Sequence, residues 1–354
     1  MSTFGRRPPR QGRALTWLFI AVVALGAATS PGSLSADPHT RFAVAEALIR
    51  TGSPELPGNL MNTVEHNGRR YCVFFPGQSL LFLPFAAVAV LVSGVGLSEA
   101  MASWAARFLA GALGVALLAA VAGTGHVAIL RLLGAGLGPA LRSGAMLVLA
   151  TPLLVYAGTG SEEIVLAALA IVAFWALVDA RTLLERATVD GGTEPVRAAL
   201  LGRVGLAGFA IAMGLIHRAT FVAVAVGALV LALPVLRRIG RLGSSWRSLA
   251  VWALAACAVL ATVPVYNWMR FGHLLDSGYG RFYEPLGGVF STPLALGLCG
   301  HLLSPGKSIF LYAPWLILLG PAIACRAVRQ RLRGLGAALL AIVVVHLILY
   351  SKFL

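Results

Sequence analysis

The sequence predicts an all-α polytopic membrane protein. Hydrophobic residues make up 58% of the 354 residues, charged residues only 12%, and the mean hydropathy is +0.85. A soluble domain is about a quarter charged, and several apolar runs here reach the roughly 20 residues that a helix needs to cross a bilayer. No stretch is long and polar enough for a separate soluble domain, so we expect residues 1–354 to form a single membrane domain.

The positive charges of the chain predict its orientation rather than a nucleic-acid partner. The formal net charge is +15, but the 28 Lys and Arg residues fall in short clusters between apolar runs, a pattern that orients membrane helices. The first apolar run, 14–29, follows the basic segment 6–13. We expect it to be a retained helix with a cytoplasmic N-terminus, although its small final residues would also suit signal-peptide cleavage. Residue 31 onward then lies outside.

The later runs follow in order, and one of them is expected not to cross. They lie at about 78–97, 104–128, 143–158, 164–180, 204–217, 219–236, 248–267, 308–325 and 335–351. If all of them crossed, the four basic clusters between them would lie outside, against the positive-inside tendency. If 78–97 lies along or dips into the outer face, all four fall inside. Pro76, Gly77 and Pro84 suit such an interfacial or re-entrant helix.

This topology gives about nine transmembrane helices and two long outer loops. The first loop, 31–103, carries the interfacial helices, and the second covers 268–306. The four basic clusters that it places inside are Arg131/Arg142, Arg181/Arg186/Arg197/Arg203, Arg237/Arg238/Arg241/Arg247 and Arg326/Arg329/Arg331/Arg333. Most of the unusual polar groups then gather on the outer face.

Asp37 is the first of only 13 acidic residues and follows the first apolar run closely. A carboxylate at the mouth of a membrane helix is costly to desolvate and is a functional candidate. Asp37 could cap a short surface helix over Thr40–Arg50. It could instead be a general base or a substrate anchor. Both interpretations stay open at this point.

Two further groups share the expected outer face. Glu162 and Glu163 begin an apolar run, where one acid stabilises the helix N-terminus. The pair could also hold a divalent cation or a hydroxyl-rich substrate. Arg218 interrupts the apolar stretch 204–236, and it could reach the interface as a snorkelling side chain or bind a phosphate group. Lys307, just before the run 308–325, would lie at the level of lipid phosphates. No nucleotide, haem, zinc or redox motif is present, so we assign no metal ligand and no certain cofactor.

Several ordered stretches resemble bacterial members of the GT-C superfamily, in the branch of protein O-mannosyltransferases and lipid-A aminoarabinose transferases. They are spread from residue 37 to 316 and cover most of the chain. The stretches are Asp37–Leu48, Gly68–Tyr71, Phe75–Leu80, Thr151–Tyr156 with Ser161–Glu163, His217–Thr220, Tyr266–Gly272 and Ser304–Ser308.

The resemblance implies a membrane glycosyltransferase that takes its sugar from a polyprenyl-phosphate carrier, with inversion, at the outer face of a bacterial inner membrane. It makes Asp37 the catalytic base and maps the second acidic site onto Glu162 or Glu163. Arg218 and Lys307 would bind phosphate. The remaining predicted substrate-binding residues, which lie in the resembling stretches, are Tyr71, Gln78, His217 and Arg270. The implied acceptor is a lipid, a glycan or a protein, and membrane lipids surround the enzyme.

The chain also departs from the family pattern. Many relatives have a second acid directly after the first, where this chain has Pro38. Relatives continue beyond the ninth span, so we expect this chain to be C-terminally truncated relative to them. Two rival functions follow: a transporter or flippase for a lipid-linked sugar, and an inactive fragment or scaffold. A transporter would place its polar groups near the bilayer midplane within inverted repeats.

Overall fold

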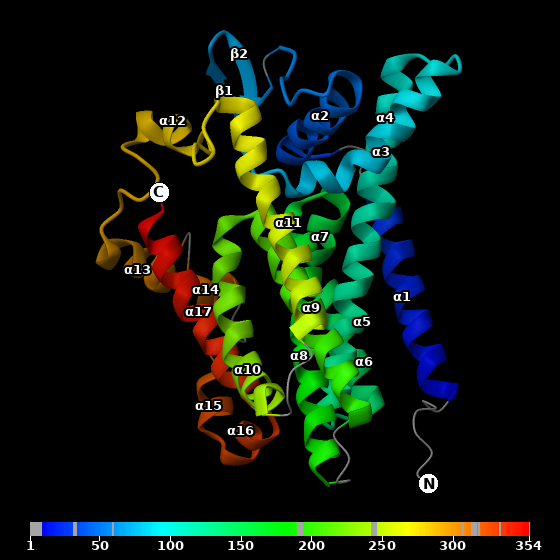
Figure 1. The fold of residues 1–354 in the computed structure, drawn as a ribbon, viewed down its shortest axis with the longest axis vertical. Helices are drawn as coiled ribbons and strands as arrows, with labels where there is room; N and C mark the ends of the chain where they lie inside the picture. The colour runs from blue at the N-terminus through cyan, green and yellow to red at the C-terminus, as the bar shows by residue number, and fades with distance from the viewer. Residues whose placement is uncertain are drawn as a thin grey trace.

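The computed structural model describes residues 9–30, 34–58, 60–189, 194–241, 246–305, 308–312, 317, 319–332 and 334–353. These residues form an elongated helical bundle that carries a smaller layer across one end (Figure 1). Among them, eight helices are long and apolar enough to cross a membrane, and a bent pair could form a ninth span. The prediction of an all-α polytopic membrane protein is therefore confirmed.

The long helices run roughly side by side (Figure 1). Their bounds are α1 Pro9–Thr29, α5 Ala116–Leu132, α8 Glu162–Val189, α9 Glu194–His217, α10 Val222–Arg241, α11 Trp246–Phe271 and α17 Leu335–Lys352. Of these, α8, α9, α10 and α11 alternate in direction (Figure 1). Several are longer than the apolar runs that predicted them, because segments that contain arginine extend α8, α9 and α10.

The predicted span 143–158 is bent in the structure. It corresponds to α6 (Leu137–Leu149) and α7 (Leu153–Thr159), which meet at an angle of 51°. Pro152 occupies the N-cap position of α7. A proline lacks the amide proton that would continue the preceding helix, so the break is expected there.

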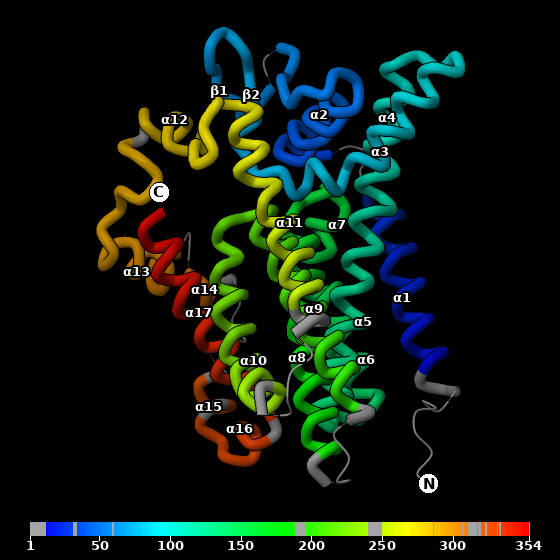
Figure 2. Tube along the Cα trace, in the orientation of Figure 1, coloured from blue at the N-terminus to red at the C-terminus, as the bar shows by residue number. Residues whose placement is uncertain are grey.

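A layer of shorter elements covers the bundle at the end that we call the α2 end. It contains α2 (Ala36–Thr51), α3 (Gly77–Gly94), α4 (Glu99–Leu109) and the strands β1 (Thr63–His66) and β2 (Arg69–Cys72). Although α3 is apolar enough to span, it lies crosswise to the long helices and packs under α2 (Figures 1 and 2). This is the placement that the arginine pattern predicts for 78–97. A π-helical stretch, Ala110–Val115, joins α4 to α5.

The strands β1 and β2 form an antiparallel hairpin, which the sequence did not predict. Its turn is Asn67-Gly68, with positive φ angles of 53° and 74°, between the paired residues His66 and Arg69. Two consecutive positive φ angles are what a tight two-residue hairpin turn requires, and Asn-Gly favours them.

The C-terminal third begins with short elements beside the α2 end and returns along the bundle (Figure 2). The predicted span 308–325 lies only partly within the described residues, which form α14 and α15. The elements are α12 Tyr279–Tyr283, η3 Glu284–Leu286, α13 Leu294–Leu303, α14 Ile309–Tyr312, α15 Leu319–Ala324 and α16 Arg326–Leu332.

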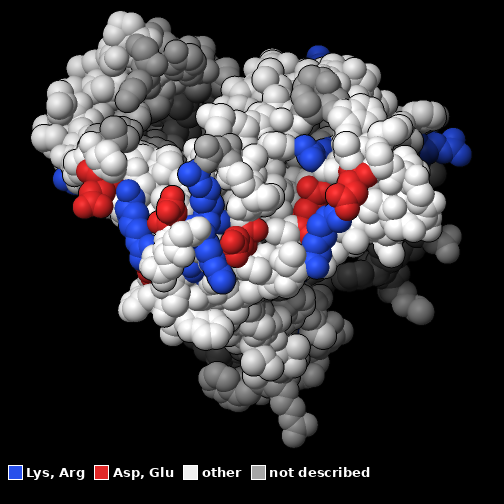
Figure 3. All heavy atoms as spheres, turned by 90° about the horizontal axis from the view of Figure 1, so that it is seen from above, with Lys and Arg blue, Asp and Glu red and all other residues white. Residues whose placement is uncertain are grey.

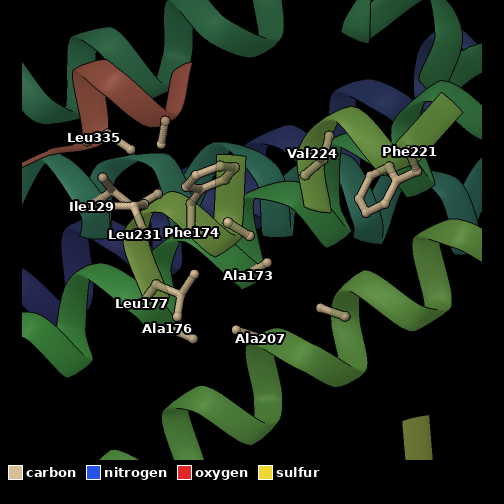
Figure 4. Close-up of a cluster of buried hydrophobic side chains, with 13 residues drawn as sticks. Ile129, Ala173, Phe174, Ala176, Leu177, Ala207, Phe221, Val224, Leu231 and Leu335 are labelled. Carbon is tan, nitrogen blue, oxygen red and sulfur yellow. The ribbon is translucent and has the colours of Figure 1, made fainter. Parts of the chain in front are cut away.

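The largest buried cluster of apolar side chains lies where α5, α8, α9, α10 and α17 meet (Figure 4). Small residues such as Ala173, Ala176 and Ala207 let the helices approach, while Phe174 and Leu231 fill the space between them. Small side chains at interfaces are the usual basis of helix association in membranes. This core holds the ends of α8, α9 and α10 in fixed relative positions.

The arginine clusters and Asp37 lie at opposite ends of the bundle. The ends of α5, α8 and α10, the starts of α6, α9 and α11, and α16 all lie at the end away from α2 (Figure 1). We call this the basic end. The separation of the two ends follows the alternation of arginine-rich and arginine-poor connections along the sequence.

Candidate functional site

The candidate site lies at the α2 end, where the starts of two helices meet the end of a third. Asp37 lies in the first turn of α2, and Glu162 and Glu163 lie in the first turn of α8. Arg218 lies between α9 and the short turn η2 (Ala219–Phe221). The helix dipole stabilises negative charge in the first turn of a helix. This local effect favours the acidic residues at the starts of both α2 and α8. The same end shows interleaved acidic and basic side chains on its surface (Figure 3).

Glu162 is the centre of a buried ion-pair cluster. Arg41 of α2 donates to its Oε2 at 2.5 Å, and Arg218 forms an ion pair with its Oε1. The Arg218 guanidinium also contacts Glu163 Oε1 at 3.1 Å. The side chains of Arg41 and Glu162 are only 3% exposed. A buried carboxylate needs such compensation, because an unpaired charge in this environment is strongly destabilising.

Gln78 extends the cluster to α3 and α7. Its side-chain oxygen accepts from Arg41 Nη1 at 2.5 Å, and its amide donates to the Gly160 carbonyl at 2.6 Å. Gly160 ends α7 with a φ of 76°, a conformation that favours glycine. The buried Gln78 therefore fixes Arg41 relative to the turn that precedes Glu162.

Asp37 differs from Glu162 because it is exposed. Its Oδ1 accepts a hydrogen bond from Asn62 Nδ2 at 2.6 Å. Ser35, not Asp37, occupies the N-cap position of α2, which begins at Ala36. Capping is therefore not the role of Asp37, and its carboxylate remains accessible at the helix start.

Two cavities adjoin at this site, and Asp37 and Arg218 line both. The smaller, of about 250 Å³, is lined by Ser35, Ala36, Asp37, Pro38, Arg41, Tyr156, Ser161, Glu162, Glu163 and Arg218. The larger, of about 500 Å³, is lined by Asp37, Phe74, Phe75, Arg218, Ala219, Thr220, Ser277, Tyr279, Gly280, Tyr283, Val289, Phe290, Leu349, Tyr350 and Phe353. A molecule bound across both cavities would contact a carboxylate and a guanidinium together.

Aromatic side chains form one wall of the larger cavity. The rings of Tyr279 and Tyr283 stack with centroids 6.0 Å apart, and Phe75 lies 5.9 Å from Tyr279. Phe353 contacts Tyr283 edge-on. Three parts of the chain thus form the wall: the segment after β2, the helix α12, and the residue that follows α17.

Two titrating side chains beside the cavities, Tyr279 and Arg218, keep their usual charge states. Burial raises the pKa of Tyr279 to about 12; Arg41 and Arg218 act against this shift, and Glu162 adds to it. Its hydroxyl therefore stays protonated and can donate. Burial disfavours the charged form of Arg218, but the carboxylates of Glu162 and Glu163 outweigh that effect and raise the pKa of Arg218 above its usual value. Arg218 thus remains a cation beside the cavities.

The other predicted site residues have different positions. The His217 ring is buried against Gly77, and its two nitrogens have no hydrogen-bond partner in the described part of the chain. Arg270 donates to the Cys72 carbonyl and, at 2.7 Å, to Asn267 Oδ1. Tyr71 packs edge-on against Phe271. These three residues join the hairpin and α3 to the long helices and do not line the two cavities. Lys307 lies outside the described residues.

Three site residues were not singled out as binding residues from the sequence. Arg41 could have been found, because it lies four positions after Asp37 and therefore on the same face of α2. Tyr279 and Tyr350 come from distant segments and have no local signal. The Tyr350 hydroxyl lies beside Arg218 and 3.4 Å from Thr220 Oγ1.

The alternative in which Glu162 and Glu163 hold a divalent cation does not gain a third ligand from the described residues. Across the described residues, no three His, Cys, Asp or Glu side chains are grouped so that they could hold a metal ion. Glu162 and Glu163 are instead paired with arginines.

Comparison with known proteins gives no relative. No family model matches the chain, and neither the curated proteins nor the solved structures contain a match.

Proposed function

We propose that this chain is a membrane glycosyltransferase of the GT-C type that transfers a sugar from a polyprenyl-phosphate carrier to a lipid, glycan or protein acceptor. The observation that carries the proposal is that Asp37 and Arg218 line the same two adjoining cavities. A base and a cation are the two groups that this transfer needs at one site. In the proposed setting, a bacterial inner membrane with a cytoplasmic N-terminus, the site faces outward.

The proposed reaction uses Asp37 as general base. Its carboxylate accepts the proton of an acceptor hydroxyl while the hydroxyl oxygen forms a bond to C1 of the sugar. The bond between C1 and the phosphate oxygen breaks, and polyprenyl phosphate leaves with the bonding electron pair. Attack opposite the leaving group inverts the configuration at C1. The exposure of Asp37 at a helix start leaves it free to meet an acceptor.

Arg218 is placed to stabilise the charge that develops on the leaving phosphate. Its side chain is 33% exposed, and Glu162 and Glu163 hold its Nη2 from one side. A guanidinium can bind phosphate through more than one nitrogen. A group that is already oriented before the reaction stabilises the transition state without further rearrangement. Glu162 and Gln78 then act as positioning residues for the two arginines.

The position of the polar cluster favours transfer over transport. A transporter is expected to bind its substrate near the bilayer midplane, between repeats. Here Asp37, Glu162, Glu163 and Arg218 all lie at one end of the bundle (Figure 1). An end-on site suits a lipid carrier and an acceptor that meet at the membrane surface.

A transfer assay tests this proposal. The full chain, purified in detergent, is supplied with radiolabelled polyprenyl-phosphate hexose or pentose and with envelope extract as the acceptor source. We expect Asp37→Asn to lower transfer at least about 100-fold, the usual effect of removing a general base. Glu99→Gln is the matched control, because Glu99 is an exposed acid at the same end that lines neither cavity. Full activity of Asp37→Asn in an active preparation would refute the proposed role.

A further inference from the structure

A second pair of cavities lies at the basic end, away from Asp37. One has a volume of about 460 Å³ and the other about 360 Å³. Both are lined by Leu15 of α1, Ala128 of α5 and Trp175 of α8. Because the two cavities share these side chains, they form one groove along α1, α5 and α8.

One end of this groove is charged. It is lined by Arg131, Asp179 and Arg203. Arg203 Nε donates to Asp179 Oδ2 at 2.7 Å, and its guanidinium lies 4.6 Å from the centre of the Trp175 ring. Arg131 donates through Nη1 to the Ala135 carbonyl at 2.6 Å. With two cations and one anion, this end has a surplus positive charge.

The other end of the groove is apolar. Phe19, Val121 and Ile171 contribute carbon surface. The hydroxyls of Thr16 and Thr124 lie here too, but each donates to a carbonyl of its own helix. The apolar end therefore presents no side-chain polar group that needs a partner from a ligand.

We propose that this groove binds one anionic phospholipid from the leaflet at the basic end. Its phosphodiester would lie between Arg131 and Arg203, and one acyl chain would follow Leu15, Ala128 and Trp175 into the apolar cavity. The surplus positive charge matches the single negative charge of phosphatidylglycerol. Basic pockets between membrane helices bind anionic headgroups in this way, whereas the positively charged ammonium group of phosphatidylcholine would be repelled by the arginines. The site is separate from the proposed transfer reaction and does not depend on it.

Lipid titration followed by native mass spectrometry tests the proposal on the full chain in detergent. The probes are phosphatidylglycerol and phosphatidylcholine with the same acyl chains. We expect tighter binding of phosphatidylglycerol, and we expect Arg131→Gln to weaken it about fivefold, the usual effect of one basic residue at a lipid headgroup. Asp179→Asn should strengthen binding, because it removes the carboxylate beside the phosphate. Ala128→Phe should weaken binding without changing charge, because it fills the junction of the two cavities.

Arg142→Gln is the matched control, since Arg142 belongs to the same basic end but does not line the groove. An equal loss in Arg142→Gln would show only general attraction to the basic surface and would overturn the proposal. Equal affinity for the two lipids would also overturn it. So would displacement of the lipid by glycerol phosphate at equal concentration, because the acyl chain would then contribute nothing.

Discussion

Adjacent acids at the start of α8 have different environments and therefore different roles. The side chain of Glu162 is 3% exposed, and that of Glu163 is 37% exposed. Consecutive helical residues point about 100° apart, so one carboxylate turns inward while its neighbour remains at the cavity. Glu162 pairs with the guanidinium groups of Arg41 and Arg218, whereas the ion pair of Glu163 within the described residues is with Arg218. Glu162 therefore stabilises the arrangement of the site, whereas Glu163 can release Arg218 when a ligand binds.

This difference predicts unequal losses of stability. Glu162→Gln should lower the free energy of unfolding by about 3–5 kcal/mol, because it leaves Arg41 with an uncompensated buried charge. Glu163→Gln should cost less than about 1 kcal/mol, as expected for a partly exposed ion pair. Chemical unfolding in detergent micelles, followed by circular dichroism, measures both values. Equal losses would contradict the assignment of Glu162 as the structural centre.

His39 of α2 gives the α2 end a pH dependence. Arg107 Nη1 donates to its Nε2 at 2.6 Å, which requires that nitrogen to be unprotonated. Burial and the charge of Arg107 lower the pKa of His39, and Glu46 opposes this shift. The folded state then binds fewer protons than the unfolded state near the imidazole pKa, so the contribution of His39 to stability is present at neutral pH and lost as the pH falls.

We therefore expect unfolding to become easier between about pH 7.5 and pH 5.5, a window that brackets the ordinary imidazole pKa. His39→Gln keeps a polar side chain beside Arg107 but removes the titrating group, so its stability should change less over the same window. Thermal unfolding of the two proteins at matched pH values measures the difference. Identical slopes would mean that other groups cause the pH dependence.

At the scale of elements, α3 depends on a close contact at its first residue. A Cβ added to Gly77 would lie 2.6 Å from the His217 ring and 2.8 Å from its Cα. Both distances are shorter than a normal contact between carbon atoms. The His217 ring could rotate, but the His217 Cα belongs to the backbone and could not. The absence of a side chain at Gly77 therefore lets α3 begin directly against the end of α9, with Gln78 aimed at Arg41.

Gly77→Ala should destabilise the protein by about 1–3 kcal/mol, the usual cost of overpacking. Gly94→Ala is the matched control at the other end of α3, because no atom lies within 4 Å of its added Cβ. That control should be neutral or slightly stabilising, since alanine restricts the unfolded chain more than glycine does. Unfolding in micelles compares the two, and similar losses would show that the contact with His217 is unimportant.

Some helices and strands of this fold are predictable from sequence patterns, and others are not. Apolar runs predicted the long helices because a run of that length has no other stable form in a bilayer. The hairpin was missed because its strands lack apolar alternation, although Asn67-Gly68 is a strong turn signal. The bend between α6 and α7 was also not predicted, because the hydropathy of a segment does not report a change in the direction of its helix axis.

At the scale of the whole molecule, the arginine pattern predicted which connections share an end, but the composition of the site needed the fold. Arg41 and Glu162 are 121 positions apart, and Arg270 and Cys72 are 198 apart. Such pairs depend on how helices pack, which local patterns do not encode. The sequence could therefore place Asp37 and Glu162 on one face, while the ion pair between Arg41 and Glu162 emerged only from the structure.

The crosswise placement of α3 determines the direction of every later helix, and it can be tested directly. If α3 crossed the membrane, its two ends would lie on opposite sides; in this structure both lie at the α2 end (Figure 1). Single cysteines are introduced after Cys72, Cys257, Cys299 and Cys325 have been replaced. We expect Glu65→Cys in β1 and Val95→Cys after α3 to react with an impermeant thiol reagent in intact cells, because both positions are exposed. Gly138→Cys, at the start of α6 and at the basic end, should react only after permeabilisation. Protection of Val95→Cys in intact cells, combined with labelling of Gly138→Cys, would show that α3 spans, and the basic clusters would then lie on the same side of the membrane as Asp37.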